Sequence, residues 1–349
     1  MNLVPLENNN GVRIEDVDLF DDQQAKDVGR ALADNCIAVI DENHMNGCDR
    51  GRVHQIHSLW GDAYQSIILR ALGTGDIKVT RHWRDVFRNF GYVVSEVPEP
   101  YRDSQTTVTY KRNEKNKPVG VFTEGEVGWH CDFPAVEDGH KVASLVSIHH
   151  TENSITDFLL TKNVYQALNH EDKSVVDELT TVYKVIPDDM EKYFPGLGKQ
   201  LPMQRAWVRW SSIPFDGQEG PLCKSTASGV RGINFPNNGF SHFKGMSVEE
   251  SNKYKDYLWE KINKPENIYT HNWKDGQWVM FDLDITLHRR PTNVTHGNER
   301  YLVRTSSYLD KLYPGQGRDP KFVVDGKRLS YQEALAKADA LCKEEFEAS

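Results

Sequence analysis

The sequence predicts an α+β protein whose strands form a β-sandwich or a jelly roll flanked by helices. Short apolar runs separated by turn residues recur between residues 105 and 312, which is typical of these folds. Helical patterns are confined to the start of the chain, to inserts between the strands and to the C-terminal end. The 349 residues contain no repeat at a fixed period and no linker rich in Gly, Ser or Pro, so we expect a single domain over residues 1–349.

Residues 1–104 are expected to form an N-terminal α/β region. Residues 21–35 predict a helix, because acidic residues begin this stretch and Asn35 lies at its end. The apolar run at 36–41 suits a short buried strand. Two more helical stretches are expected at 50–59 and 63–72.

Residues 105–312 are expected to form a jelly-roll core with helical inserts. The predicted strands are residues 119–123, 141–149, 203–210, 278–282 and 300–308. The predicted helical inserts are residues 162–168, 173–179 and 248–262. Residues 313–349 are expected to end in an amphipathic helix at 330–346, whose apolar side chains recur at helical spacing.

The chain is moderately acidic, which argues against binding to nucleic acid. Its 42 Lys and Arg residues and 51 Asp and Glu residues give a formal net charge of −9, whereas phosphate backbones are bound by clustered cations. Charged residues make up 27% and apolar residues 38% of the chain, which is ordinary for a globular protein and excludes global disorder. No apolar run approaches the roughly 20 residues of a membrane-spanning helix.

The cysteines are distributed as in a protein of a reducing compartment. Their number is odd, and they lie far apart without a Cys-x-x-Cys pair, which indicates free thiols rather than a disulfide framework or a Cys-rich zinc site. The start of the chain lacks the basic segment and apolar stretch of a signal peptide. We therefore expect a cytoplasmic protein.

Histidine and acidic residues at metal-ligand spacing point to a metal site. Three His-x-Asp/Glu matches are present where chance predicts about two, so the spacing alone is uninformative. His130 and Asp132 lie among aromatic and apolar residues, whereas the matches at 150–152 and 170–172 lie in polar stretches expected to be turns. In an extended chain His130 and Asp132 point to one face and Cys131 to the other, which lets an imidazole and a carboxylate bind one cation.

A third ligand is expected from the segment that ends at His288, where a turn and an apolar strand are followed by a bend. Two imidazoles and one carboxylate form the facial triad of non-haem Fe(II) oxygenases, which leaves three coordination positions open. A structural zinc site more often has four protein ligands, and the sequence suggests no fourth. Arg300 follows 12 residues (300 − 288) after His288. A buried guanidinium there suits a dicarboxylate co-substrate, because its planar fork matches a carboxylate.

With these residues in place, the chain resembles a known family. Four ordered elements resemble the 2-oxoglutarate-dependent Fe(II) oxygenases of the taurine dioxygenase family: Trp129-His-Cys-Asp132, the segment 275–282 (Asp-Gly-Gln-Trp-Val-Met-Phe-Asp), His288 and Arg300. The resemblance extends loosely over nearly the whole chain, including residues 11–19, 39–41 and Thr156 with 164–168. His-Cys-Asp stands in place of the family's usual His-Thr-Asp, and Asn-Ser-Ile in place of Gly-Gly-Asp before the threonine.

The resemblance implies a double-stranded β-helix (jelly roll) and an iron-dependent active site. By this resemblance, His130, Asp132 and His288 are the catalytic Fe(II) ligands. Arg300, helped by Thr156, holds the distal carboxylate of 2-oxoglutarate, whose keto acid end chelates the metal. O2 is the second co-substrate, and decarboxylation to succinate accompanies oxidation of an unactivated C–H bond.

Two further residues are the expected contacts of the substrate. Arg304 lies an even number of positions after Arg300 and so shares its strand face, and its counterpart in the family commonly meets an anionic group. Glu126, four residues before His130, lies where the family often has a substrate contact. Together they suit a small polar substrate, such as a zwitterionic amino-acid derivative or a carboxylate. The sequence does not encode whether the product is hydroxylated, desaturated or cyclised.

Two other functions are compatible with the same fold, because jelly rolls host many unrelated functions. One is a non-catalytic module that binds a small molecule. The other is a cupin-type dioxygenase that does not use 2-oxoglutarate and therefore releases no succinate. In each case the expected partner is a small molecule rather than nucleic acid or a membrane. The oligomeric state is left open, a homo-oligomer included.

Overall fold

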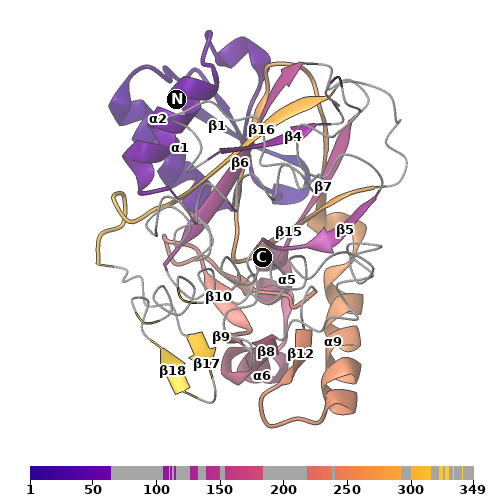
Figure 1. Ribbon diagram of the computed structural model, residues 1–349. Helices are drawn as coiled ribbons and strands as arrows, with labels where there is room; N and C mark the ends of the chain where they lie inside the picture. The colour runs from indigo at the N-terminus through magenta and orange to yellow at the C-terminus, as the bar shows by residue number, and fades with distance from the viewer. Residues whose placement is uncertain are drawn as a thin grey trace.

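The computed structural model describes residues 1–63, 105–109, 126–132, 139–149, 154–183, 218–237, 240–291 and 300–315, the segments 322–324 and 327–329, and residues 111, 114, 333 and 340. These residues form two β-sheets packed face to face, helices on the outer face of the larger sheet, and an insert of helices and short strands beyond one end of the sheets (Figure 1). The two sheets are the part of the fold that positions the candidate site.

The larger sheet has seven strands, and its first three come from the N-terminal region. Its strand order is β1 (Asn2–Pro5), β2 (Val12–Glu15), β3 (Ile37–Ile40), β14 (Trp278–Asp282), β6 (Lys141–His149), β16 (Tyr301–Tyr308) and β4 (Gln105–Thr109). Strands β2 and β3 run parallel, and the other neighbours run antiparallel. The N-terminal strands are thus continuous with the sheet that holds β16.

The smaller sheet has four antiparallel strands and faces the larger one. Its order is β13 (Ile268–Asn272), β7 (Ile155–Leu160), β15 (Thr286–Arg290) and β5 (Val127–His130). Along the chain, β4, β6, β14 and β16 fall in the larger sheet, whereas β5, β7, β13 and β15 fall in the smaller one. The chain therefore crosses between the sheets at almost every step, which is the connectivity of a jelly roll.

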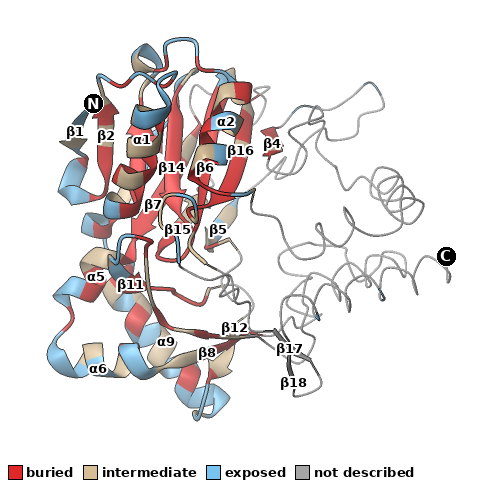
Figure 2. Ribbon diagram, turned by 90° about the vertical axis from the view of Figure 1, so that its left-hand side faces the viewer, coloured by how far each residue is buried: buried red, intermediate tan, exposed pale blue. Residues whose placement is uncertain are grey.

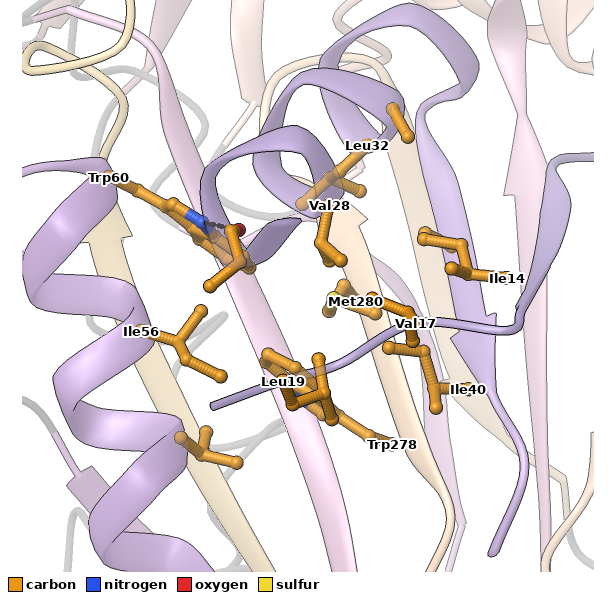
Figure 3. Close-up of a cluster of buried hydrophobic side chains, with 14 of the residues drawn as sticks. Ile14, Val17, Leu19, Val28, Leu32, Ile40, Ile56, Trp60, Trp278 and Met280 are labelled. Carbon is orange, nitrogen blue, oxygen red and sulfur yellow. Dashed lines mark hydrogen bonds between the residues drawn. The ribbon is translucent and has the colours of Figure 1, made fainter. Parts of the chain in front are cut away.

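Helices α1 (Asp22–Asn35) and α2 (Arg50–Trp60) cover the outer face of the larger sheet, over strands that are largely buried (Figure 2). Alternate residues of β14 explain this burial. Trp278 and Met280 belong to the apolar cluster beneath the helices, whereas Val279 and Phe281 point to the opposite side. Figure 3 shows this cluster, where Trp60 of α2 donates its indole N–H to a carbonyl oxygen of α1 at 2.7 Å. A strand covered on both faces needs an uninterrupted apolar run.

The space between the two sheets is filled by a second apolar cluster. Phe281 of β14 and Phe158 of β7 meet there with ring centroids 5.2 Å apart. The ring of His288 in β15 lies 4.9 Å from that of Phe281, so the core continues directly into the region of the candidate metal ligands. Packing of this kind holds the two sheets in one relative position.

An insert between β7 and β13 carries most of the remaining structure (Figure 1). Its helices are α5 (Thr161–Ala167), α6 (His170–Glu178) and α9 (Val248–Ile262), and its strands are β8 (Thr180–Tyr183), β9 (Gln218–Pro221), β10 (Cys223–Ser225), β11 (Arg231–Ile233) and β12 (Phe240–Phe243). Helix α9 begins with a capping box formed by Ser247 and Glu250. A third apolar cluster joins the insert to Leu159 and Leu287 of the smaller sheet. None of the helices in the described ranges is both long and apolar enough to span a bilayer.

Short elements complete the described chain. The 3-10 helices are η1 (Glu7–Asn9), η2 (Glu42–His44) and η4 (Pro265–Asn267), and the last two strands are β17 (Phe322–Val324) and β18 (Lys327–Leu329), which pair with each other.

The predicted elements that fall on described residues are found, with small shifts at their ends. Strands β6 and β14 and helix α9 have the predicted bounds, whereas α1 begins one residue later and α6 three residues earlier than predicted. The strands predicted at 119–123 and 203–210 lie outside the described residues. So do the helix predicted at 63–72, apart from residue 63, and the C-terminal helix at 330–346, apart from residues 333 and 340. The predicted divisions after residues 104 and 312 stay predictions.

Candidate active site

Two histidines and an aspartate come together on the smaller sheet. His130 is the last residue of β5, and His288 lies directly opposite it in β15. The two ring centroids are 4.1 Å apart. Asp132 follows β5 by two residues, and one donor atom from each of the three side chains lies within 4.8 Å of the others. A single metal ion fits this spacing.

The alternation of side chains along a strand explains why these three groups share a side. His130 and Asp132 flank Cys131, which is only 2% exposed and packs in the third apolar cluster. Arg289, the residue after His288, points to the opposite face in the same way. Its guanidinium lies over the indole ring of Trp129, 4.6 Å from the ring centroid. Each ligand candidate therefore has a neighbour that anchors the opposite face of its strand.

The backbone selects the tautomer of His130. Its Nδ1 lies 2.8 Å from the carbonyl oxygen of Gly128, so Nδ1 carries the proton and donates it. The lone pair is then on Nε2, which lies 3.8 Å from Oδ1 of Asp132. A carbonyl that accepts from the other ring nitrogen is the usual way to orient a metal-binding histidine.

The electrostatics keep His288 and Asp132 in the forms that bind metal. Burial lowers the pKa of His288 to about 3, so its imidazole is neutral at pH 7. Burial alone would raise the pKa of Asp132, but the opposing effects of Arg304, His288 and His130 hold that pKa well below its ordinary value. At neutral pH the cluster thus offers a neutral imidazole and an ionised carboxylate, the forms in which these groups bind metal.

Arg304 reaches from the larger sheet to the carboxylate of Asp132. Its Nη2 donates to Oδ2 of Asp132 at 2.5 Å, and its Nη1 donates to Oγ of Ser306 at 3.0 Å. The side chains of Arg304 and Asp132 are only 16% and 18% exposed, so water screens the ion pair weakly. The sequence predicted Arg304 as a substrate contact, and the structure adds a bond to one of the candidate ligands.

The other predicted site residues differ in burial. Arg300 directly precedes β16 and is 2% exposed. Thr156 lies in β7 of the facing sheet, is 6% exposed, and accepts a hydrogen bond of 2.9 Å from the indole Nε1 of Trp273. Glu126 directly precedes β5 and is exposed. Arg300 and Thr156 are therefore buried polar groups from opposite sheets, whereas Glu126 lies at the surface.

The turn that leads to His288 is held by buried Asp and Lys side chains that no sequence motif marks. Oδ1 of Asp282 accepts from the backbone N–H groups two and three residues further on, at 2.8 and 2.9 Å. Asp284 accepts from Lys224 at 3.0 Å, and Nζ of Lys141 lies 3.8 Å from the same oxygen. All four side chains are buried or nearly so. They fix the point at which the chain passes from the larger to the smaller sheet.

Only part of this supporting set has a signal in the sequence. Ser306 lies two residues after Arg304 and so shares its strand face, which the alternation rule detects. The pairing of Lys224 with Asp284 and of Trp273 with Thr156 joins residues 60 and 117 positions apart, and no motif marks them.

Comparison with known proteins adds an independent result. The model of the family described as "Taurine catabolism dioxygenase TauD, TfdA family" matches residues 3–306. The alpha-ketoglutarate-dependent 2,4-dichlorophenoxyacetate dioxygenase of Burkholderia sp. (strain RASC) is 26% identical over 146 residues, which are 39% of this chain and 49% of that protein. The match thus spans about half the length of this curated relative.

Solved structures share the fold. A taurine dioxygenase from Burkholderia xenovorans superposes with a TM-score of 0.60 at 17% identity, over 97% of this chain and 98% of its own. AAD-2, crystallised with Mn(II) and N-oxalylglycine, gives a TM-score of 0.60 at 16% identity, over 88% of this chain and 97% of its own. These likenesses confirm the predicted jelly roll with flanking helices. Because the family model covers most of the chain, this protein belongs to the taurine catabolism dioxygenase TauD, TfdA family, a family of Fe(II)- and 2-oxoglutarate-dependent dioxygenases.

Proposed function

We propose that this protein is an Fe(II)- and 2-oxoglutarate-dependent oxygenase that oxidises an unactivated C–H bond of a small polar molecule. One observation carries the proposal: two imidazoles and a carboxylate, from segments more than 150 residues apart, lie with their donor atoms within 4.8 Å of one another. This donor set is the facial triad of non-haem iron oxygenases. His130, Asp132 and His288 are the proposed ligands.

The chemistry of the donors fits a ferrous ion. Within the described ranges, the group of possible ligands at this position has three members. Structural zinc sites more often use four protein ligands, whereas three leave room for a co-substrate and dioxygen. An Fe(II) ion here supplies the redox chemistry that couples oxidation of the keto acid to oxidation of the substrate.

Arg300 and Thr156 are the proposed contacts of the distal carboxylate of 2-oxoglutarate. Arg300 is almost completely buried and directly precedes β16, the strand that carries Arg304. Its planar fork can hold a carboxylate through two parallel hydrogen bonds. The hydroxyl of Thr156, from the facing sheet, adds a neutral donor to the same group.

Arg304 and Glu126 are the proposed contacts of the substrate. Arg304 uses Nη2 for Asp132 and Nη1 for Ser306, and a guanidinium has five N–H donors in total. Its remaining donors suit a carboxylate or sulfonate of the substrate. Exposed Glu126 suits an ammonium group, so that the pair together selects a zwitterionic amino-acid derivative, and Arg304 alone selects a simple carboxylate.

The proposed overall reaction is balanced in atoms and electrons. For hydroxylation, the substrate C–H, O2 and 2-oxoglutarate give the alcohol, succinate and CO2, with one oxygen atom in each of the alcohol and succinate. For desaturation or ring closure, two hydrogen atoms leave the substrate and one oxygen atom ends in water. In each outcome the four electrons that reduce O2 come in equal parts from the keto acid and from the substrate.

A spectroscopic test separates this proposal from a binding module. Anaerobic protein with Fe(II) and 2-oxoglutarate is expected to show a weak visible charge-transfer band that the variant His288→Ala lacks. A protein that binds neither the metal nor the keto acid, and so shows no band, would refute the proposal. Substrate oxidation without succinate release would instead indicate a dioxygenase that does not use 2-oxoglutarate.

A screen of succinate release tests the substrate class. Amino acids, sulfonates and small carboxylates are supplied with O2, and His288→Ala serves as the blank. Anionic substrates are expected to increase succinate release over the substrate-free rate. The variant Glu126→Gln should slow turnover of an amine-bearing substrate and leave turnover of a simple carboxylate unchanged. If the variant turns over the amine-bearing substrate as fast as wild-type protein does, Glu126 is not a substrate contact.

A further inference from the structure

A small polar group interrupts the apolar interior between the two sheets. Thr156 in β7 lies opposite His271 in β13, and Phe158 lies opposite Tyr269 in the same register. Trp273 follows β13, and its backbone N–H bonds to the carbonyl oxygen of Ser154 at 3.0 Å. These residues line the inner face of the smaller sheet, the face that carries the side chain of Thr156.

The contact between Trp273 and Thr156 has a defined direction. Nε1 of Trp273 donates to Oγ1 of Thr156 at 2.9 Å, and the two residues are 2% and 6% exposed. An indole N–H can only donate, so the hydroxyl must act as acceptor in this bond. The hydroxyl proton of Thr156 consequently points away from Trp273 and remains available to a second acceptor.

The indole of Trp273 is itself held in place by aromatic neighbours. Its ring meets that of His271 edge to face, with centroids 4.4 Å apart and an interplanar angle of 79°. Nδ1 of His271 lies 2.9 Å from the hydroxyl of Tyr269, whose ring stacks on Phe158 at 6.4 Å. Burial lowers the pKa of His271 to about 4 and raises that of Tyr269 to about 12, so both are neutral at pH 7. A neutral, packed neighbourhood leaves the indole little freedom to turn.

We propose that Trp273 is a positioning residue for the co-substrate: by donating to Thr156, it directs the Thr156 hydroxyl proton towards the carboxylate of 2-oxoglutarate. This inference rests on the proposed function, since it assumes that Thr156 meets this carboxylate. A donor oriented before binding does not lose rotational freedom on binding, and a hydroxyl that accepts one hydrogen bond donates a stronger one. Without the indole N–H, the hydroxyl turns freely and the affinity for 2-oxoglutarate falls.

The test is a titration of 2-oxoglutarate into anaerobic Fe(II) protein, followed by the visible charge-transfer band. Trp273→Phe keeps an aromatic ring and removes the donor, and Thr156→Val keeps the shape and removes the hydroxyl. Each is expected to raise the Kd for 2-oxoglutarate by about 3- to 10-fold, the loss of one hydrogen bond. The double variant should bind 2-oxoglutarate with a Kd no higher than that of the single variant with the higher Kd, because both changes remove the same interaction.

A second buried tryptophan provides the matched control. Trp278 is fully buried on the outer face of the larger sheet, stacked on Trp60 with centroids 5.9 Å apart, and its Nε1 has no hydrogen-bond partner among the described residues. Trp278→Phe should lower thermal stability and leave the Kd for 2-oxoglutarate unchanged. Thr156→Ser, which keeps the hydroxyl, should lose less affinity for 2-oxoglutarate than Thr156→Val.

The outcomes separate this inference from the function on which it rests. If wild-type protein gives no band with 2-oxoglutarate, the proposed function fails. If Thr156→Val leaves the Kd unchanged, Thr156 has no part in co-substrate binding and the inference fails with it. If Thr156→Val weakens binding but Trp273→Phe does not, or if the two effects add, the role of Trp273 is refuted and the proposed function stands.

A measurement on the intact indole covers the case in which Trp273→Phe does not fold. With Zn(II) in place of Fe(II), the indole N–H resonance of Trp273 is expected to shift when 2-oxoglutarate is added to wild-type protein. In Thr156→Val the resonance should move upfield before any addition and then respond less to 2-oxoglutarate. An identical resonance in both proteins would contradict the proposed bond.

Discussion

Two buried histidines of this protein, His57 and His288, have similarly lowered pKa values and differ in their hydrogen bonds. His57 packs beside Trp60 and Trp278 on the outer face of the larger sheet, and His288 lies between the sheets beside Phe281. Burial lowers the pKa of each to about 3, so both rings are neutral at pH 7. Yet both nitrogens of His57 are bonded to serines, Ser307 and Ser144, at 2.8 Å each. Those bonds leave His57 no lone pair for a metal ion.

The candidate metal ligands are arranged in the opposite way. Among the described residues, His130 makes its hydrogen bond through Nδ1, and its Nε2 lies 3.8 Å from Oδ1 of Asp132. Nδ1 of His288 has no hydrogen-bond partner among the described residues, and its ring lies 4.1 Å from that of His130. Burial and a low pKa therefore do not by themselves identify a ligand. A ligand is identified by a ring nitrogen whose lone pair makes no hydrogen bond and which lies beside other metal-binding groups.

The largest expected effect comes from removing a candidate ligand. His288→Ala should weaken Fe(II) binding by more than about 100-fold, since even changes to groups behind a ligand typically cost about 10- to 100-fold. Calorimetric titration with Fe(II) under anaerobic conditions measures this, and succinate release should fall to background. Metal affinity close to that of wild type would show that His288 is not a ligand.

The matching change at His57 should affect stability rather than metal binding. His57→Ala leaves two serine hydroxyls unbonded and opens a cavity beside Trp60, so the free energy of unfolding should fall by about 2–4 kcal/mol. Urea denaturation measures the change, and Fe(II) affinity of the folded variant should equal that of wild type. A loss of metal affinity at constant stability would contradict the comparison.

A smaller effect is expected from the ion pair behind Asp132. Arg304→Met removes the donor to Oδ2 and frees the carboxylate to rotate, so Fe(II) affinity should fall by about 10-fold. Arg231→Met is the control, because Arg231 pairs with Asp177 at 2.8 Å while its side chain is 50% exposed. That variant should bind Fe(II) like wild type, and equal losses in both variants would rule out a specific role for Arg304.

A further expected effect is on the pH dependence of stability. The pKa of His57 is about 3 in the folded protein against an ordinary 6.5, so the unfolded chain takes up the proton first as the pH falls. Stability is therefore lost between about pH 6.5 and pH 3, with a slope of up to about 1.4 kcal/mol per pH unit for this group. His57→Gln should reduce the measured slope between pH 6 and pH 4 by about that amount. If His57→Gln leaves this slope unchanged, His57 takes up its proton in the folded protein as readily as in the unfolded chain.

Local rules were sufficient for much of the fold. Helix α9 has its predicted bounds, and the capping box at its start joins residues only three positions apart. Strand β14 also has its predicted bounds, and a strand covered on both faces is one continuous apolar run. Each of these signals depends only on residues close together in the chain.

The candidate site was predictable only in part. The two-residue period of a strand predicts that His130 and Asp132 share a face, and that Arg300, Arg304 and Ser306 share another. No pattern in the sequence indicates that Asp132 bonds to Arg304 or that Asp282 and Asp284 hold the turn before His288. The bond between Arg304 and Asp132 crosses between the two sheets, and Lys224 reaches Asp284 from the insert, 60 positions away in the chain.

The sequence by itself determined which residue types are present, which of them share a strand face, and where the helices begin and end. Tertiary structure alone decided that His288 lies opposite His130 and that Thr156 lies within reach of Trp273. The physical reason is strand register. A shift of one residue between β15 and β5 would turn His288 to the other face, and that register depends on the packing of both sheets rather than on any local segment.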